Sequence, residues 1–380
     1  MGRKTRCIIT LVFAVAAMAC DIATPPSAEP ATGTLLVAER MFDGEAFTDD
    51  SAVLIEGKSI AAVGSQDDLE DRAAEVVDLG NATLLPGFID LHVHLGVVNG
   101  YTQLPNEGVM TVRDLGIEEA LLPFPDSDAL QVIVAGPLLT TPGGYPIPVH
   151  GSRVAGPVEG IDEARAKVRE LVGLGAGVIK VAVHFGRAGW PVLSLEEFRA
   201  IVDEAHSHGL PVSAHVQERE GLDLALKAGV DDLAHLPCRG SFPRAVWERV
   251  VAADIEIIGT MYVLDDYCEG RATKIARRFL DAGGTLLYGT DLGAPEVPFG
   301  IVIEELELMM EAGMSLEGAL AAATAKSGDF LGLAPLGSVV SGAPADLIAV
   351  TGDLRDGLRY LAEPIFAMAD GRVVTQPVGR

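Results

Sequence analysis

The sequence GFIDLHVHLG, residues 87–96, places two histidines one residue apart inside an apolar run. Successive side chains of a β-strand point to opposite faces, so His92 and His94 project together while Leu91, Val93 and Leu95 project the other way. One face of this predicted strand therefore carries two imidazoles. A hydrogen-bonded, partly solvated histidine pair explains the segment as well as metal binding does, so the choice depends on what the rest of the chain supplies.

Short β-branched or apolar runs alternate with helical patterns from residue 84 onward. The predicted strands lie in the segments 83–95, 108–116, 130–137, 178–183, 211–216, 231–236, 255–261 and 285–291. Between the fourth and fifth strands, Ser194 and Glu197 have the spacing of a capping box, which predicts a helix that Gly209 ends. Eight strands separated by helices predict a (β/α)8 TIM barrel over residues 84–334, an α/β fold. The alternative is an open doubly wound sheet, but no Gly-rich phosphate loop follows the first strand.

The two ends of the chain differ from this central region. Residues 34–83 and 335–380 read as short strands with glycine turns and without a long helix. Because these β-rich ends enclose one barrel, we expect them to meet as a small β-sandwich domain.

The N-terminus has a basic start, an apolar run from Ile8 to Ala19 and then Cys20. This pattern predicts a secretory signal over residues 1–19, too short for a convincing membrane span. The letters AMAC resemble a bacterial lipoprotein box, which makes Cys20 the candidate for lipid attachment; plain cleavage near Ala19 is the alternative. Residues 20–33 are rich in proline and small side chains and predict a flexible tether. We expect an exported protein, either periplasmic or a membrane-anchored lipoprotein.

The strong negative charge of the mature chain excludes some classes of binding partner. Removal of residues 1–19 leaves 25 Lys and Arg against 54 Asp and Glu, a formal charge of −29. Such a surface repels nucleic acid and anionic lipid, so we expect a small-molecule substrate, no nucleic acid, and membrane contact only through the N-terminal lipid; a homo-oligomer remains open. Cys238 and Cys268 are compatible with a disulfide in an oxidising compartment and equally with two free thiols.

Polar side chains stand where several predicted strands end, which is where barrel enzymes carry their chemistry. They are His92 and His94 on the first strand, Lys180 on the fourth, His215 on the fifth, His235 on the sixth and Asp291 on the eighth. Burying so many ionisable groups is costly unless something pairs them, and a divalent metal ion does so. Lys180 fits either as the salt-bridge partner of Asp291 or as a carbamate formed with carbon dioxide, which turns a cation into an anionic ligand.

This set, with the segments LLPGFIDLHVHLG, TVRDLG, ADLIAV and DGRVV, resembles the amidohydrolase superfamily of the binuclear type, from about Thr34 to Val374. It is most similar to zinc-dependent prolidase-like and acylamino acid amidohydrolases. The resemblance implies two divalent metal ions, expected to be zinc: a buried one on His92, His94 and Asp291, an exposed one on His215 and His235, and the Lys180 carbamate bridging them. It also implies that a hydroxide between the metals attacks a carbonyl carbon while Asp291 accepts and then delivers the proton. We expect hydrolysis of the amide or peptide bond of a dipeptide or N-acyl amino acid.

Two other functions compete with this one. Glu218, three residues after His215, resembles the proton shuttle of mononuclear heterocycle deaminases in the same superfamily, although those lack the strand-four lysine. The segment around Glu218 reads equally well as the acidic start of a helix. The second alternative is a non-catalytic metal-binding lipoprotein, against which the complete ligand set argues.

Substrate contacts are predicted from position alone. Tyr145 and His150 lie in the loop after the third strand, and His184 lies four residues after Lys180. A planar guanidinium suits a carboxylate, so we expect one arginine after a strand to bind such a group. The candidates are Arg113, Arg153, Arg187 and Arg239. The segment 262–270 is expected to be a solvated acidic loop after strand seven.

Overall fold

Two parallel sheets contain the strands of the central region. The computed structural model describes residues 32–125, 127, 129–186 and 189–375. One sheet has the order β10 (Ala155–Pro157), β9 (Leu138–Thr140), β11 (Ile179–Val183), β12 (Val212–Val216), β13 (Asp232–Leu233), β14 (Glu256–Ile258) and β15 (Leu286–Leu287). The other contains β6 (Phe88–Val93), β7 (Val109–Asp114) and β8 (Gln131–Val134). Each of the eight predicted segments contains a strand, while β9 and β10 are additional.

Isolated backbone hydrogen bonds join the two parallel sheets at both sides. Leu91 N donates to Tyr288 O over 3.2 Å and Asp291 N donates to His92 O over 2.8 Å, which places β6 beside the end of β15. On the other side, Gly177 N donates to Val134 O over 2.9 Å, which connects β8 with the start of β11. The first and last parallel strands are therefore neighbours, although strand pairing within the described residues gives two sheets rather than one closed ring.

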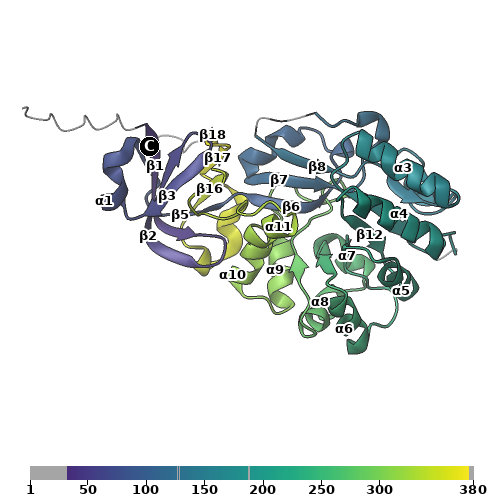
Figure 1. Ribbon diagram of the computed structural model, residues 1–380. Coiled ribbons are helices and arrows are strands. Elements are labelled where there is room, and N and C mark those ends of the chain that lie inside the picture. Colours follow the sequence, from purple (N-terminus) through teal and green to yellow (C-terminus); the bar gives the residue numbers. More distant parts are fainter. Residues whose placement is uncertain (1–31, 126, 128, 187–188, 376–380) are drawn as a thin grey trace, which may run out of the picture.

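Helices follow most of the parallel strands, and this alternation makes the fold α/β. They are α2 (Ile147–His150), α3 (Ile161–Gly173), α4 (Leu195–Ser207), α5 (Arg219–Ala228), α6 (Arg244–Ala252), α7 (Met261–Tyr267), α8 (Ala272–Leu280), α9 (Ile303–Glu311), α10 (Leu316–Ala322) and α11 (Ala325–Phe330). The 3₁₀ helices are η1 (Glu70–Arg72), η2 (Leu95–Val97), η3 (Tyr101–Glu107), η4 (Glu119–Leu121), η5 (Leu354–Asp356) and η6 (Leu358–Ala362). Figure 1 shows α3 to α6 along the outer side of the teal and green half of the molecule.

Helix α4 illustrates how local sequence and packing agree. Ser194 accepts a hydrogen bond from Glu197 N, and the Glu197 side chain accepts one from Ser194 N, so the predicted capping box is confirmed. Gly209, at a φ of 73°, lies two residues beyond the helix end. Phe198 and Ile201 are fully buried, and burying each side chain stabilises the packing of the helix on the sheet by roughly 1.5–3 kcal/mol.

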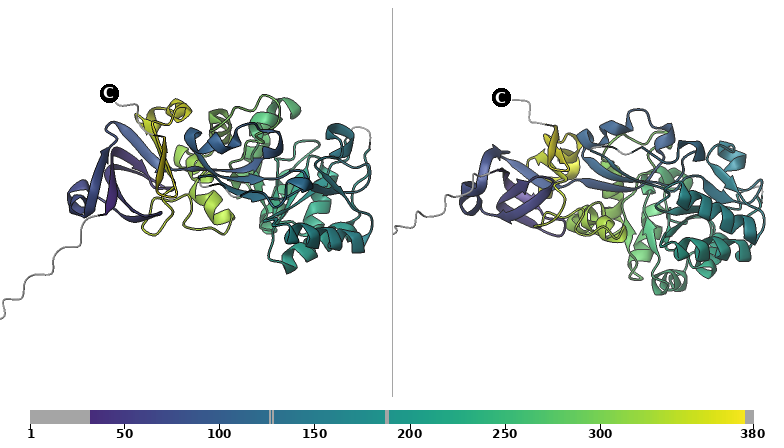
Figure 2. Two further views of the ribbon diagram at one scale, coloured as in Figure 1. Left: turned by 90° about the horizontal axis from the view of Figure 1, so that it is seen from above. Right: turned by 45° about the horizontal axis from the view of Figure 1, so that its top comes forward.

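Strands from both ends of the chain form a separate mixed sheet at one end of the molecule (Figures 1 and 2). Its order is β18 (Arg372–Thr375), β17 (Phe366–Ala369), β16 (Leu347–Thr351), β5 (Ala82–Pro86), β1 (Gly33–Phe42), β2 (Phe47–Glu56) and β3 (Ser59–Gly64), with β4 (Ala73–Asp78) paired to β1. The antiparallel pairing of β16 with β5 joins strands from the two chain ends in this one sheet, and the expected β-sandwich stays a prediction. The short helix α1 (Gln66–Leu69) packs near β2 through the buried Leu69.

One predicted strand is two strands in the structure. The segment 83–95 contributes β5 to the mixed sheet and β6 to the parallel sheet, with Gly87 between them. A Cβ atom at Gly87 would lie 2.2 Å from Met110 Cγ, so a residue without a side chain is required where the chain passes between the sheets. The apolar pattern is continuous across this break because both strands are buried.

Several predictions fall outside the described residues, namely the signal peptide, most of the tether, Cys20 and Arg187. Among the helices that the structure does describe, none is long and apolar enough to cross a bilayer. Cys238 and Cys268 form a disulfide rather than remaining two free thiols. The expected acidic loop 262–270 is wrong for its first part, because residues 261–267 form α7.

Candidate metal centre and substrate cavities

His92 lies on β6, and His94 follows the end of that strand. Both point their Nε2 atoms toward the carboxylate of Asp291. His92 Nδ1 lies 2.7 Å from Ala234 O, and His94 Nδ1 lies 3.2 Å from Gly116 O. A carbonyl only accepts hydrogen bonds, so each Nδ1 carries a proton and each ring turns its Nε2 toward the cavity. The Nε2 atoms of His92 and His94 lie 3.5 and 3.1 Å from Asp291 Oδ1. This is the arrangement of histidines prepared as metal ligands.

Asp291 is held in a strained backbone conformation after β15. Its φ is 61°, in the left-handed region, and its N donates to His92 O. Burial by itself would raise the pKa of Asp291, but the nearby His92 and His94 outweigh burial and hold that pKa well below its usual value. The carboxylate therefore stays ionised.

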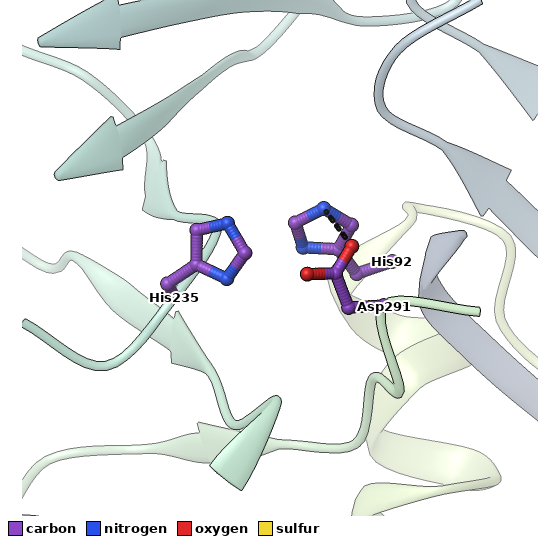
Figure 3. A group of neighbouring side chains, drawn as sticks. All are labelled: His92, His235 and Asp291. Atoms are coloured by element: carbon purple, nitrogen blue, oxygen red, sulfur yellow. Dashed lines mark ion pairs between the residues drawn. The ribbon is translucent and has the colours of Figure 1, made fainter. Parts of the chain in front are cut away.

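His215 and His235 face the same space from β12 and the residues after β13. His235 Nδ1 lies 2.9 Å from the hydroxyl of Thr260, and the His215 ring stacks on Tyr145 with centroids 4.4 Å apart. Burial lowers the pKa of His235 to about 3 and takes the pKa of His215 well below its usual value, so both rings are neutral. Figure 3 shows the His235 ring facing His92 and Asp291. Each of these three residues offers one ligand atom, and the three atoms lie within 4.8 Å of one another.

Lys180 is buried, with 1% of its surface exposed, and lines the same cavity as this group. Its Nζ atom has no hydrogen-bond partner among the described residues, and no ion pair joins it to Asp291. Burial lowers the pKa of Lys180 to about 7, which gives a large fraction of neutral amine near neutral pH. A neutral amine is the form that reacts with carbon dioxide, whereas the salt bridge expected as the alternative is not present.

All six of these side chains line one cavity of about 570 Å³. Three of their buried donor atoms, His92 Nε2, His215 Nε2 and Lys180 Nζ, have no partner within the described part of the chain. Leaving buried polar atoms unpaired costs about 1–3 kcal/mol each, so the protein gains from a ligand that pairs several of them at once. Nitrogen donors with one carboxylate suit a divalent ion such as zinc, and the residues therefore fit a metal centre.

A second cavity of about 440 Å³ adjoins the first and shares Tyr145, His150, His215, His235 and Asp291 with it. The structure places the predicted substrate residues around these two spaces. Tyr145 and His150 line both, His184 and Arg239 line the second, and Arg153 lines the first. Sequence reasoning missed Trp190 and Tyr267, aromatic residues on segments after β11 and β14 that form walls of the second cavity.

The three described arginine candidates have different surroundings. Arg113 is buried and makes two hydrogen bonds with Asp232, of 2.9 and 3.0 Å, which removes it from the candidates for substrate binding. Arg153 is exposed and paired with Glu118. Arg239 lies over the ring of Tyr267, 4.0 Å from its centroid, and forms no ion pair with a described carboxylate.

Glu218 has a structural partner. Its carboxylate lies 3.0 Å from His184 Nδ1 and also accepts a hydrogen bond from Phe185 N over 3.4 Å. It lines neither of the two cavities, and it immediately precedes α5 as the N-cap residue. These contacts agree better with the helix start than with a proton shuttle.

The parallel α/β fold and the histidine, lysine and aspartate donors around one cavity define a metal-dependent hydrolase. The chain belongs to the Amidohydrolase family, whose sequence model matches residues 83–378. It is therefore a hydrolase that acts on carbon–nitrogen bonds.

Comparisons with individual proteins agree with this family. The chain is 26% identical to ochratoxinase from Aspergillus niger over 398 aligned residues, covering 85% of this chain and 81% of that protein. The crystal structure of A. niger ochratoxinase superposes with a TM-score of 0.78 at 22% identity, covering 92% of this chain and 96% of the other. A Xaa-Pro dipeptidase with bound methionine in the active site gives a TM-score of 0.79 at 23% identity, covering 90% of this chain and all of the other.

Proposed function

We propose that the protein hydrolyses the amide bond of a small substrate at a centre of two divalent metal ions, expected to be zinc. The observation that carries the proposal is the single cavity lined by all six donors, three of which have buried atoms without a partner among the described residues. His92, His94 and Asp291 would hold one ion, His215 and His235 the other, and a carbamate on Lys180 both. When bound, such ions lower the pKa of a water molecule and polarise a carbonyl group.

A closed barrel and a small second domain would surround the metal centre. The two parallel sheets would be parts of one (β/α)8 barrel over residues 84–334, which the hydrogen bonds at both seams support. Residues 34–83 and 335–380 would form the small β-sandwich domain. The three histidine-bearing segments and Asp291 would then stand at the carboxyl ends of barrel strands.

Asp291 would move the proton during hydrolysis. Its carboxylate is ionised and lies within 3.5 Å of both His92 Nε2 and His94 Nε2, so it can accept a proton from the attacking water. The same oxygen would then deliver that proton to the leaving nitrogen. Lys180 would contribute differently: its neutral amine forms a bond to the carbon of carbon dioxide and releases a proton, which leaves an anionic carbamate.

Arg239 would bind a carboxylate on the leaving amino acid. Among the described residues that line the second cavity, Arg239 is the arginine, and it forms no ion pair with a described carboxylate. A guanidinium presents several donors in one plane and suits a carboxylate in a cavity with aromatic walls.

The first cavity selects the other half of the substrate. Its lining includes the apolar Val97, Leu138 and Val154, while the lining carboxylate of Glu118 is already paired with Arg153. An uncharged acyl group fits these walls better than a free ammonium, which would need an unpaired carboxylate. We therefore favour an N-acyl amino acid as the substrate. A dipeptide is the second candidate, because Glu118 would meet its ammonium if Arg153 turned away.

The test is the metal content per chain, measured by plasma mass spectrometry on protein expressed with zinc and bicarbonate, with Lys180→Ala beside it. We expect two equivalents in the wild type and a sharp fall in the variant. N-acyl amino acids and dipeptides are then screened for turnover. One equivalent that does not depend on Lys180 would favour the mononuclear deaminase with Glu218, and metal binding without any turnover would favour the non-catalytic protein.

A further inference from the structure

The disulfide joins the sequence neighbours of two residues that line the second cavity. Cys238 immediately precedes Arg239, and Cys268 immediately follows Tyr267. The bond therefore joins the two chain segments that carry the two sides of one cation–π contact. Those segments are separated by 30 residues in the sequence and follow different strands, β13 and β14.

The disulfide is buried, and hydrogen bonds connect the backbone on both sides of it. Cys238 is 0% exposed and Cys268 is 1% exposed. Arg271 bridges the two cysteine carbonyls, since its Nε donates to Cys268 O over 3.0 Å and its Nη2 to Cys238 O over 3.5 Å. On the other side, Arg239 N donates to Gln217 O over 2.9 Å. The backbone on both sides of the cavity wall is thus tied to the disulfide.

The position of the Arg239 guanidinium depends on the ring below it. An arginine side chain loses rotamer freedom when it is fixed, and no described carboxylate orients this one. The centroid of the Tyr267 ring lies 4.0 Å from the guanidinium carbon, and this cation–π contact is what positions the guanidinium at the cavity. Tyr267 is the last residue of α7, a helix of seven residues, and a turn with a left-handed Glu269 follows. The disulfide is the covalent link that keeps this helix end against the Arg239 segment.

We propose that the Cys238–Cys268 disulfide is a specificity-determining element, which keeps Tyr267 under Arg239 and so preorganises the site for the substrate carboxylate. This inference rests on the proposed function, because it takes Arg239 to be the carboxylate-binding residue. Reduction by a dithiol breaks the sulfur–sulfur bond, gives two cysteine thiols and converts the reagent to its own disulfide. The freed α7 end no longer fixes the guanidinium, so affinity for carboxylate substrates falls.

The metal donors should be insensitive to this change. His92, His94 and Asp291 lie on β6 and after β15, and His235 is oriented by Thr260, which precedes α7. A loss of the disulfide therefore acts on KM for substrates with a carboxylate, while kcat and metal content are preserved. A disulfide that only stabilised the fold would affect charged and uncharged substrates alike.

The experiment compares an N-acyl amino acid with its C-terminal carboxamide, which lacks the negative charge. In the Cys238→Ala/Cys268→Ala protein, we expect KM for the acid to rise about tenfold or more, the loss of one charge-assisted contact. We expect kcat for the acid, the kinetics of the amide and the metal content to stay at wild-type values. Tyr267→Leu, which retains the disulfide, should show the same KM change.

Arg239→Met separates this inference from the proposed function on which it depends. If Arg239→Met loses the preference for the acid and the cysteine substitutions add nothing in that background, the inference is supported. If Arg239→Met loses the preference but the disulfide-free protein keeps it, the inference alone is overturned. If Arg239→Met keeps the preference, the assignment of the carboxylate site fails and the inference fails with it.

A second preparation keeps the test valid if the double variant does not fold. Wild-type protein is treated with dithiol under native conditions, and the freed thiols are counted with a thiol reagent before the kinetics are measured. Reduced protein with two free thiols and unchanged KM for the acid overturns the inference. Equal losses for the acid and the amide overturn it too, because they indicate a structural role only.

Discussion

The buried ion pair between Arg113 and Asp232 allows the loss in free energy of unfolding to be predicted for variants that lack one partner. The two side chains are 1% and 0% exposed and meet through two hydrogen bonds. Arg113 Nε also donates to Leu91 O over 2.9 Å, and Ser213 Oγ donates to Asp232 over 2.7 Å. The pair thus joins β6, β7, β12 and β13, the strands that carry or precede most of the candidate ligands.

Removing one partner leaves the other as an unpaired charge in the core. We expect Asp232→Leu and Arg113→Met each to lower the free energy of unfolding by about 3–5 kcal/mol. The double variant leaves no buried charge, so its loss should be far smaller than the sum, and the coupling between the two sites should exceed about 3 kcal/mol.

Urea unfolding of the four proteins, analysed as a double-mutant cycle, measures this coupling. Ser213→Ala is the matched control, since it removes one hydrogen bond to Asp232 without removing a charge, and should cost about 1 kcal/mol. Additive losses in the double variant, or single losses below that of the control, would refute the argument that the pair is a desolvated charge network.

Other parts of the chain give further predictions. Lys180→Ala should lose metal and activity, both partly restored by short carboxylic acids that replace the carbamate; unchanged turnover would end the binuclear proposal. Burial raises the pKa of Glu305 from 4.5 to about 8, so only the unfolded chain ionises between these values and stability falls as pH rises through that window. Glu305→Gln should reduce this fall in the Tm-against-pH curve while its amide oxygen still accepts from Tyr262 N, and parallel curves for the two proteins would contradict this. Ser194→Ala should lower stability by about 1 kcal/mol through loss of the α4 cap, measured by urea unfolding. Cys20→Ser should abolish labelling by a radioactive fatty acid; export without any label on the wild-type protein would reject the anchor.

Local pattern was enough to predict much of the fold. All eight predicted segments contain a strand, and the helix after Ser194 begins where its capping box indicates. Alternation placed His92 and His94 on one face, because the period of a strand is a property of the backbone and needs no knowledge of its neighbours. Barrel enzymes carry their chemistry at the carboxyl ends of parallel strands, and this rule pointed to the six donors. The structure brings all six around one cavity.

Other predictions failed because their outcome depends on long-range contacts. Sequence position made Arg113 and Arg239 equivalent candidates, yet Arg113 pairs with Asp232, 119 residues away, and Arg239 stays without a described carboxylate. The apolar run 83–95 also concealed the transfer between two sheets at Gly87, because both strands are buried.

Periodicity, caps and strand ends are local properties of the chain, so they predict the helices and strands of this protein and the types of side chain at their ends. Which polar groups pair with one another depends on the tertiary fold. It joined Cys238 to Cys268, left Lys180 Nζ buried without a described partner and set Tyr267 beneath Arg239. Pairing depends on which segments meet in space, and burial then sets the charge state of each group that remains unpaired.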